Sequence, residues 1–269
     1  MQDQPIEPGA TRRTRADGRD DLLVREEPLW IEVHGDRVLT MRTPGHDEDL
    51  ALGFLLSEGV IDGLARVAST TFAAGDPASL RPDTLRVTLS EPARARTSGR
   101  LTRTHEIRPS CGICGLVDAD QMLDELPPLL PGVPRITRAA IDGFRTRFAA
   151  QQPLFAATGA SHGAVLFGAD GTPWGHGEDV GRPNALDKAI GMAARAGHPL
   201  DRAVAMLSGR AGFDLVLKCL RLRIAVILSV LAPSALAFDL CRSAGATLLG
   251  FVRDDRAQVY CDPGRLETP

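Results

Sequence analysis

Long apolar stretches are missing from this sequence. No run approaches the ~18 to 20 apolar residues that a membrane-spanning helix needs, and the first 21 residues lack the apolar core of a signal peptide. A strong excess of charge is missing as well, because the formal net charge is only -3 at pH 7. We therefore predict a cytoplasmic protein whose composition points to neither a membrane nor a nucleic-acid partner.

Cysteine is scarce, and its number is odd: the 269 residues include five. In a reducing compartment, two cysteines close together indicate metal or redox chemistry more readily than a structural disulfide. What is present in quantity, 43% hydrophobic and 24% charged residues, is typical of a soluble globular protein with one large or two ordinary domains.

The patterning divides the chain into three parts. Residues 1–21 are polar and aperiodic, which predicts a disordered tail. Residues 22–135 are predicted to form a β-rich part that ends in a cysteine-bearing loop. This part contains a hairpin in PLWIEVHGDRVLTMRT, a helix in PGHDEDLALGFLLSEGVI that is capped by His46 or Asp47, and a strand in LRVTLS.

Residues 136–269 are predicted to form an α/β part. Strands and helices alternate there at lengths typical of βαβ units, in which helices cover a largely parallel sheet. The expected fold class is therefore α/β. A hairpin is expected at 162–175, strands at 202–209, 224–231 and 246–252, and helices at 180–197, 212–223 and 233–245.

Two cysteines, Cys111 and Cys114, stand three positions apart in SCGICG, at the end of a loop without regular periodicity. That spacing suits half of a zinc site, an oxidoreductase pair or a nucleophilic thiolate. Gly112 and Gly115 give the backbone freedom, which suits a mobile thiol that visits a donor and then an acceptor. Zinc needs further ligands and only His105 is near in sequence, so we predict no permanent metal.

The other three cysteines, Cys219, Cys241 and Cys261, lie singly on elements predicted to belong to the core. Cys219 and Cys241 fall on apolar helix faces, where a buried structural role is expected. The cysteine pair, by contrast, is preceded by a run of arginines. Positive charge favours thiolate over thiol and steers anionic ligands, although such a run can equally be a solvated surface. These arginines are Arg94, Arg96, Arg100, Arg103 and Arg108.

Three turns that follow predicted strands carry exposed amides and arginine side chains. Amides at a helix start, together with cations, make an anion site. Ligands of open α/β sheets bind where strands end, so three such turns predict a large phosphorylated ligand. The residues are Arg182, Asn184 and Lys188 in the first turn, Ser208, Gly209 and Arg210 in the second, and Arg253 and Arg256 in the third.

Five motifs follow one another along the chain: TMRTPGHDEDLALGFLLSEGVI, SCGICG, GEDVGRPNALDKAIG, SGRAGFDLVLK and LLGFVRDDRAQVY. In this order and spacing they closely resemble the formate dehydrogenase accessory proteins, also called the sulfur carrier or FdhD family. The resemblance extends over nearly all of residues 22–262. It implies a homodimer and an αβα sandwich similar to the cytidine deaminase-like fold, without zinc chemistry and with a mobile CxxC loop.

The resemblance also implies a function. Members of that family are understood to act as sulfurtransferases that accept sulfur from a cysteine desulfurase as a persulfide. They pass it to the molybdenum cofactor, in its bis-molybdopterin guanine dinucleotide form, before the cofactor enters formate dehydrogenase. Cys111 matches the persulfide-bearing cysteine and Cys114 its companion. The segment matched to cofactor binding consists of Phe251, Val252, Arg253, Asp254, Asp255 and Arg256.

Two positions depart from the family pattern. Pro183 stands where many relatives have histidine, so any hydrogen bond or proton transfer from that side chain is lost, although a first helical turn tolerates proline. Leu231 stands where serine is usual. His162 matches a family histidine, for which a structural and a catalytic role are both open. Three other functions also remain open: a cofactor-binding chaperone without sulfur transfer, a zinc-stabilised interaction module and a dithiol oxidoreductase.

Overall fold

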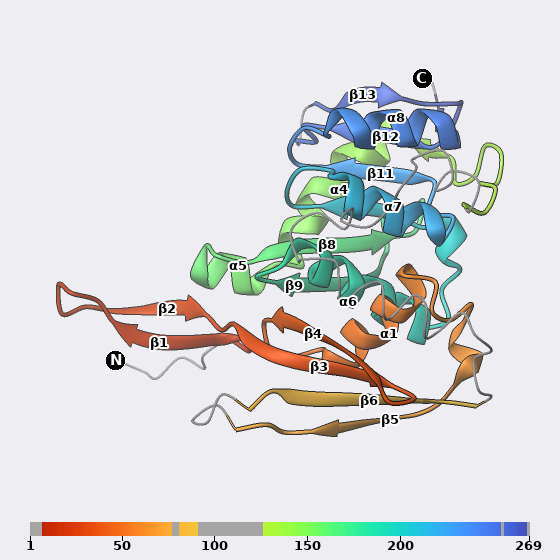
Figure 1. The fold of residues 1–269 in the computed structure, drawn as a ribbon. Helices are drawn as coiled ribbons and strands as arrows, with labels where there is room; N and C mark the ends of the chain where they lie inside the picture. Colours follow the sequence, from red (N-terminus) through yellow and green to blue (C-terminus); the bar gives the residue numbers. More distant parts are fainter. Residues whose placement is uncertain (1–6, 77–80, 91–125, 254–255, 268–269) are drawn as a thin grey trace.

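The fold is built on two sheets, a four-stranded one from the first half of the chain and a six-stranded one from the second half (Figure 1). The computed structural model describes residues 7–76, 81–90, 126–253 and 256–267. Predictions for four of the candidate site residues lie outside these ranges and stay predictions. The four are Cys111, Cys114, Asp254 and Asp255.

The six-stranded sheet is mixed. Its strands are β8 (His162–Phe167), β9 (Pro173–Asp179), β10 (Val204–Leu207), β11 (Val226–Ser229), β12 (Thr247–Gly250) and β13 (Gln258–Cys261), in the order β13-β12-β11-β10-β8-β9. Strand β11 runs parallel to β10 and β12, whereas the other three pairings are antiparallel. The prediction of a largely parallel sheet is therefore wrong. Hairpin β8–β9 has to be antiparallel, and β13 returns beside β12 without a crossover helix.

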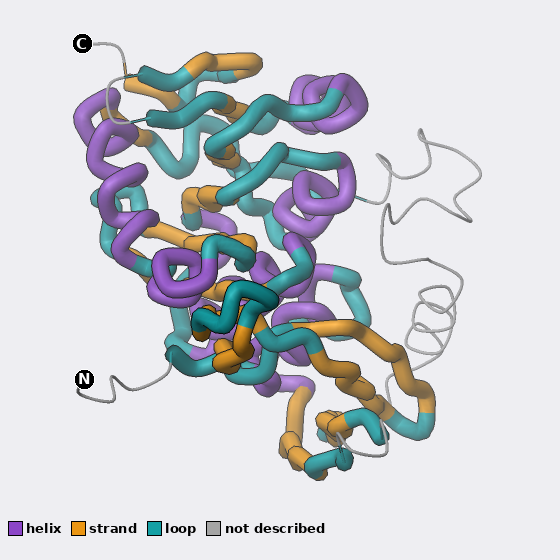
Figure 2. The backbone as a smooth tube through the Cα atoms, turned by 90° about the vertical axis from the view of Figure 1, so that its left-hand side faces the viewer, coloured by secondary structure: helices purple, strands orange, loops and turns teal. Residues whose placement is uncertain are grey.

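Helices cover both faces of this sheet (Figure 2). One face carries α4 (Arg138–Ala150), and the other carries α6 (Arg182–Arg195), α7 (Phe213–Arg221) and α8 (Ala235–Ala244). Alternation along β10 explains the two layers, because Ala205 and Leu207 join the core under α6 to α8 while Val204 and Met206 join the core under α4. The αβα layering and the three predicted helices are confirmed. Likeness to the cytidine deaminase-like fold stays an expectation.

The four-stranded sheet has the order β4-β3-β6-β5 and confirms the predicted hairpin, which is β3–β4. Its strands are β3 (Glu27–Val33), β4 (Asp36–Arg42), β5 (Val67–Ala73) and β6 (Asp83–Leu89). The predicted helix is α1 (Asp47–Ser57), which lies between this sheet and α6 (Figure 1). The two helices nearly touch, since a Cβ on Gly53 would lie 1.8 Å from the backbone oxygen of Asp187. Glycine is therefore required where α1 crosses α6.

The segment predicted to be a disordered tail forms a β-hairpin over its described residues. Strands β1 (Ala10–Thr14) and β2 (Asp20–Val24) pair antiparallel across a turn in which Gly18 has a φ of +80°. Arg12 and Asp20 form an ion pair across the strands at 3.9 Å. Main-chain pairing and opposite charges order this stretch without a broad apolar face. The predicted boundary after residue 21 falls inside β2.

Several short elements were not expected from the sequence pattern. They are α5 (Pro153–Thr158), β7 (Ile136–Thr137) and β14 (Leu266–Glu267), and β14 pairs with β7. The buried Arg265 secures this corner by donating to the carbonyl oxygens of Leu130, Val133 and Gly245 at 2.7 to 2.9 Å. Such long-range bonds to backbone groups leave no periodic signal in the sequence.

Candidate ligand-binding site

The carboxyl ends of β10, β11 and β12 form one continuous edge. The backbone amide of Leu231 donates to the carbonyl oxygen of Gly209 at 3.2 Å, and that of Phe251 donates to the carbonyl oxygen of Leu231 at 3.4 Å. These bonds bind together the three loops that leave the parallel strands. We call residues 208–210, 231 and 251–253 the strand-exit edge. It contains the second predicted anion turn and, of the third, Arg253, at the place where open α/β sheets bind ligands.

The first predicted turn meets this edge through Arg182, the first residue of α6. A Cβ on Gly209 would lie 3.3 Å from Cδ of Arg182 and 3.9 Å from Nδ1 of His162. Arg182 is partly exposed and Arg210 is exposed. Neither guanidinium has a hydrogen bond or ion pair with any of the residues that the structure describes. Two cations are thus available to an anionic ligand beside a turn that has no side chain at its centre.

His162 opens β8 at the same edge, where its surroundings favour the neutral imidazole. Burial lowers the pKa of this imidazole, and the charge of Arg182 lowers it further, while Asp179 acts in the opposite direction. A neutral imidazole has one nitrogen that accepts a proton or a hydrogen bond. His162 can therefore accept a hydrogen bond at this edge, and its lowered pKa makes it a weaker proton acceptor than a free imidazole.

Asn184 and Lys188 serve the fold. Nζ of Lys188 lies 2.7 Å from a carboxylate oxygen of Asp179 and donates to the carbonyl oxygens of Thr43 and Glu178 at 2.8 and 3.0 Å. An ammonium has three donors, so none remains for a phosphate. Lys188 is also only 1% exposed. The predicted ligand contact of Lys188 is therefore corrected to a structural role.

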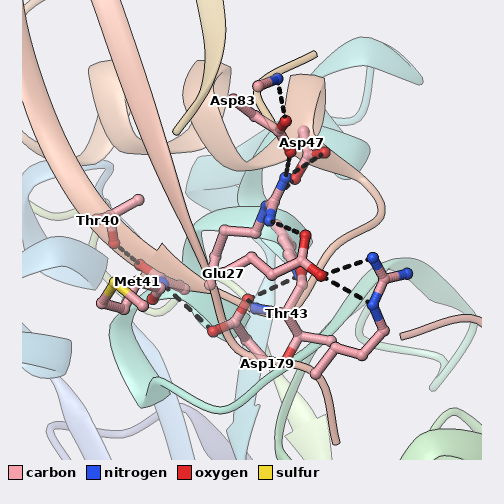
Figure 3. Close-up of polar contacts among 12 residues, drawn as sticks. Glu27, Thr40, Met41, Thr43, Asp47, Asp83 and Asp179 are labelled. Atoms are coloured by element: carbon pink, nitrogen blue, oxygen red, sulfur yellow. Dashed lines mark hydrogen bonds and ion pairs between the residues drawn. The ribbon is translucent and has the colours of Figure 1, made fainter. Parts of the chain in front are cut away.

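The side-chain amide of Asn184 is also engaged in hydrogen bonds within the protein, and Figure 3 labels its partners Thr40, Met41 and Asp179. Its nitrogen donates to the carbonyl oxygen of Met41 at 2.7 Å and to Asp179 at 3.2 Å, and its oxygen accepts from the hydroxyl of Thr40 at 3.2 Å. The fully buried Asp179 also accepts from the backbone amide of Thr43 at 3.0 Å. Asn184 and Asp179 therefore attach α6 to β4. The sequence analysis did not identify Asp179. The signal that could have revealed it is an acidic residue just before the glycine turn in GEDVG.

A buried arginine organises the approach from β4 to α1. Arg42 is 1% exposed and forms ion pairs with Glu27, Asp47 and Asp83 (Figure 3). Burial acts to lower the pKa of this guanidinium, but Asp47 and Asp83 outweigh it and the pKa is raised. Arg42 therefore stays charged and holds three separate elements around the start of α1. The sequence analysis predicted no ligand contact for Arg42. Because its charge is already paired, we propose none.

The remaining predicted residues divide into anchors and exposed groups. Val252 is fully buried, and its amide donates to the carbonyl oxygen of Ser229 at 3.1 Å, so it anchors the turn. The hydroxyl of Ser208 accepts from the amide of Gly163 at 2.9 Å. Arg253 and Arg256 are exposed, and the backbone amide of Arg253 donates to the carbonyl oxygen of Arg256 at 2.8 Å.

Apolar side chains are exposed beside these cations. Leu231 is 43% exposed and Phe251 is 38% exposed. The backbone of Phe251 has a φ of 51°, a left-handed conformation that is uncommon for a bulky residue. Such strain persists where the surrounding structure demands it, often at ligand sites. Phe251 is consequently presented at the edge as an apolar surface on which a planar ring can lie.

Other ligand sites are not evident in the described part of the chain. A shallow pocket of ≈ 490 Å³ lies at the opposite end of the sheet, where it is lined by Trp174, Arg135 and Arg202 among others, and none of the predicted site residues contributes to it. Within the described ranges, no three His, Cys, Asp or Glu side chains are grouped to hold a metal. No helix there is long and apolar enough to cross a membrane.

Comparison with known proteins is consistent with this architecture. A family model described as FdhD/NarQ matches residues 24–267. The sulfur carrier protein FdhD of Anaeromyxobacter dehalogenans (strain 2CP-C) is 43% identical, over 91% of this chain and 88% of the relative. That of Nocardia farcinica is 40% identical, over 93% and 90%. A crystal structure of a proposed formate dehydrogenase accessory protein from Desulfotalea psychrophila has a TM-score of 0.71 at 24% identity, over 96% of this chain and 98% of that chain, a likeness of fold alone.

Proposed function

Because this chain belongs to the FdhD/NarQ family, we propose that it is a sulfur carrier in the maturation of formate dehydrogenase. Its relatives are named sulfur carrier protein FdhD, which supports the carrier role. The donor in this proposal is a cysteine desulfurase. The acceptor is the bis-molybdopterin guanine dinucleotide form of the molybdenum cofactor, which a homodimer binds as its substrate before delivery to formate dehydrogenase.

Sulfur uptake would use the Cys111 thiolate. It attacks the outer sulfur of the desulfurase persulfide, a bond forms between that sulfur and Cys111 Sγ, and the donor thiolate leaves with the electron pair of the broken bond. In delivery, the Cys114 thiolate attacks Cys111 Sγ and the outer sulfur leaves as hydrosulfide towards the cofactor. The Cys111–Cys114 disulfide that remains is returned to two thiols by a cellular dithiol.

The observation that carries the binding half of the proposal is the pair of unpartnered cations at the strand-exit edge. Arg182 and Arg210 have no ionic partner among the described residues, and the edge between them lacks a side chain at Gly209. A phosphate can approach such a backbone closely and gain charge-assisted hydrogen bonds. Phe251 adds an apolar surface for a guanine or pterin ring.

Sulfur transfer is tested by intact-mass spectrometry after incubation with a cysteine desulfurase and cysteine. We expect wild type to gain the mass of one or more sulfur atoms, and Cys111→Ser to gain none. Cys114→Ser should still accept sulfur, since its role begins at release. Cys219→Ala, which alters a fully buried cysteine, is the matched control and should behave as wild type. Failure of wild type to gain sulfur from an active donor would refute the carrier role.

Ligand binding is tested separately with guanosine diphosphate, which carries the guanine and phosphate groups of the cofactor. Calorimetry should show weaker binding by Arg182→Gln and by Arg210→Gln. Arg202→Gln removes an equal charge at the opposite end of the sheet and should bind as wild type does. Equal loss in all three variants would mean that only the overall charge matters, and the edge would no longer be the proposed site.

A cofactor-binding chaperone without sulfur transfer is the second candidate. It is favoured by the fact that the strand-exit edge is assembled entirely from residues outside the cysteine loop. The two functions separate in cells that need formate dehydrogenase. Activity that survives Cys111→Ala but is lost in Arg182→Gln would support the chaperone, whereas loss in both variants supports the carrier.

A further inference from the structure

Strand β5 leaves one long edge of the four-stranded sheet open. It is the last strand in the order β4-β3-β6-β5, and Figure 1 shows it at the lower margin of the molecule. Within the described ranges β5 pairs only with β6, and residues 68–73 take part in no main-chain hydrogen bond outside that ladder. The outward-facing amides and carbonyls of an edge strand are a template for pairing with another chain.

The other edges of the two main sheets are protected in ways that β5 is not. Strand β4 carries three charged residues, and the carbonyl oxygen of its Met41 accepts from Asn184 at 2.7 Å. Strand β9 begins with a proline and ends with two acids, and β13 is four residues long. Charge, proline and shortness each discourage pairing between chains. The seven residues of β5, VASTTFA, include no charge and no proline.

Strand β5 is held in place but left uncovered. The hydroxyl of Thr70 donates to Glu48 of α1 at 2.6 Å, and Glu48 forms an ion pair with Arg195 at 3.0 Å. Phe72 is nevertheless 49% exposed, and most other residues of the strand are exposed as well. The one irregularity in the β5–β6 register lies at the start of the strand, before Ser69. The rest of this edge is therefore regular, fixed in position and accessible.

We propose that two copies of this chain pair through β5, antiparallel and across a two-fold axis, so that two four-stranded sheets form one continuous sheet. Two-fold symmetry makes every residue of β5 face a residue of the same strand. A charged residue in β5 would lie close to its own copy, and like charges destabilise a ladder. A strand without charge is therefore suited to pair with itself. This inference rests on the homodimer of the proposed function and assigns a surface to it.

Overlap along the whole strand fixes the register. Pairing of all seven residues places the central residue, Thr70, opposite the partner subunit's Thr70, and Ser69 opposite the partner subunit's Thr71. Pairs of threonine and serine are favourable in antiparallel ladders. Phe72 lies on the same face as Thr70, because both stand opposite buried residues of β6. Its ring then lies diagonally beside the partner subunit's Thr70 and loses part of its exposure.

Sedimentation equilibrium of the full-length protein tests the pairing surface. Wild type should be a dimer. Thr71→Lys puts a cation on the edge, two positions from its own copy in the ladder, and should give a monomer. Thr88→Lys is the matched control, since it alters an exposed threonine on the same face of the neighbouring strand β6, and it should remain a dimer. Circular dichroism establishes that each variant is folded.

Disulfide cross-linking tests the register. Thr70→Cys is made in a protein whose only other cysteines are the fully buried Cys219 and Cys241, with serine at the other three positions. Mild oxidation should join two copies, because Cβ atoms directly opposite each other lie about 4.5 to 5.5 Å apart. Thr88→Cys in the same background should not cross-link, because its two copies would be three strand spacings apart, roughly 14 Å.

A wild-type monomer would overturn the inference, and so would a dimer that Thr71→Lys leaves intact. A dimer in which Thr70→Cys forms no cross-link would overturn the proposed pairing too. The strand-exit edge lies within one chain, so Thr71→Lys should bind guanosine diphosphate as wild type does. If wild type gains no sulfur but forms a dimer that Thr71→Lys disrupts, the pairing surface is supported while the carrier role is refuted.

Discussion

The ammonium of Lys188 lies 2.7 Å from the carboxylate of Asp179, and both side chains are at most 2% exposed. This pair joins the end of β9 to the second turn of α6, directly behind Arg182. The sequence pattern predicts that Lys188 binds phosphate, but its ammonium is engaged in this ion pair and helps to position Arg182. Arg182 is left as the charge of α6 that faces the strand-exit edge.

Lys188→Met should destabilise the protein strongly. It leaves a buried carboxylate without its cation, which typically costs about 3 to 5 kcal/mol in the free energy of unfolding. The double variant Asp179→Asn, Lys188→Met removes both charges and should recover part of that loss. Urea unfolding of the three proteins measures the difference. If the double variant is no more stable than Lys188→Met, the unpaired charge is not the cause.

Gly53→Ala should separate α1 from α6. The added methyl would lie 1.8 Å from the backbone oxygen of Asp187, so the helices must move apart, at a cost of roughly 1 to 3 kcal/mol or more. Gly63→Ala is the matched control because nothing lies within 4 Å of its added methyl and its φ is 173°. Denaturant unfolding should detect a loss in the first variant only. Equal stability of the two would mean that the helix crossing is looser than described.

Phe251→Gly should separate stability from ligand binding. Glycine adopts a φ of 51° without the steric cost of a side chain, which is worth roughly 1 kcal/mol, and this offsets the loss of a partly exposed ring. Unfolding free energy should therefore change little, while affinity for guanosine diphosphate falls. Phe72→Ala alters an exposed phenylalanine, 49% exposed on β5, and should keep full affinity. Undiminished binding by Phe251→Gly would exclude stacking on this ring.

The buried carboxyl of Asp187 should make stability depend on pH. Burial raises its pKa from 3.8 to about 6, against the attraction of Lys218 and a hydrogen bond from Ser57. The folded state therefore binds this proton more tightly than the unfolded state. The contribution of Asp187 to the free energy of unfolding is greatest below the unfolded pKa and falls as the pH rises through the folded one.

Asp187→Asn removes this titration. Urea unfolding from about pH 4 to about pH 7 should show wild type losing stability relative to the variant as the pH rises. Asp239→Asn changes a carboxyl that is 54% exposed and serves as the control. A wild-type advantage that instead grows with pH would mean that Lys218 outweighs burial and that the pKa of Asp187 is depressed.

The sequence by itself determined where most strands and helices lie. Apolar periodicity marks β3, β4 and the helices α6, α7 and α8, because each buries one face. Short continuous apolar runs mark β10, β11 and β12, which are buried on both faces. It also identified the turns with Arg182 and Arg210, since glycine and cations at strand ends are a local pattern. The motifs that carry the family resemblance are local as well.

Only the tertiary structure decided strand direction, pairing and the fate of each polar group. Strands β8 and β9 form a hairpin that lies beside β10. Local periodicity does not show on which side of β10, or in which direction, that hairpin pairs. The structural roles of Lys188 and Arg42 depend on partners that come from distant segments of the chain. The spacing of apolar residues is a local property of the sequence, whereas the partner of a charge depends on how separate elements pack, which the local pattern does not specify.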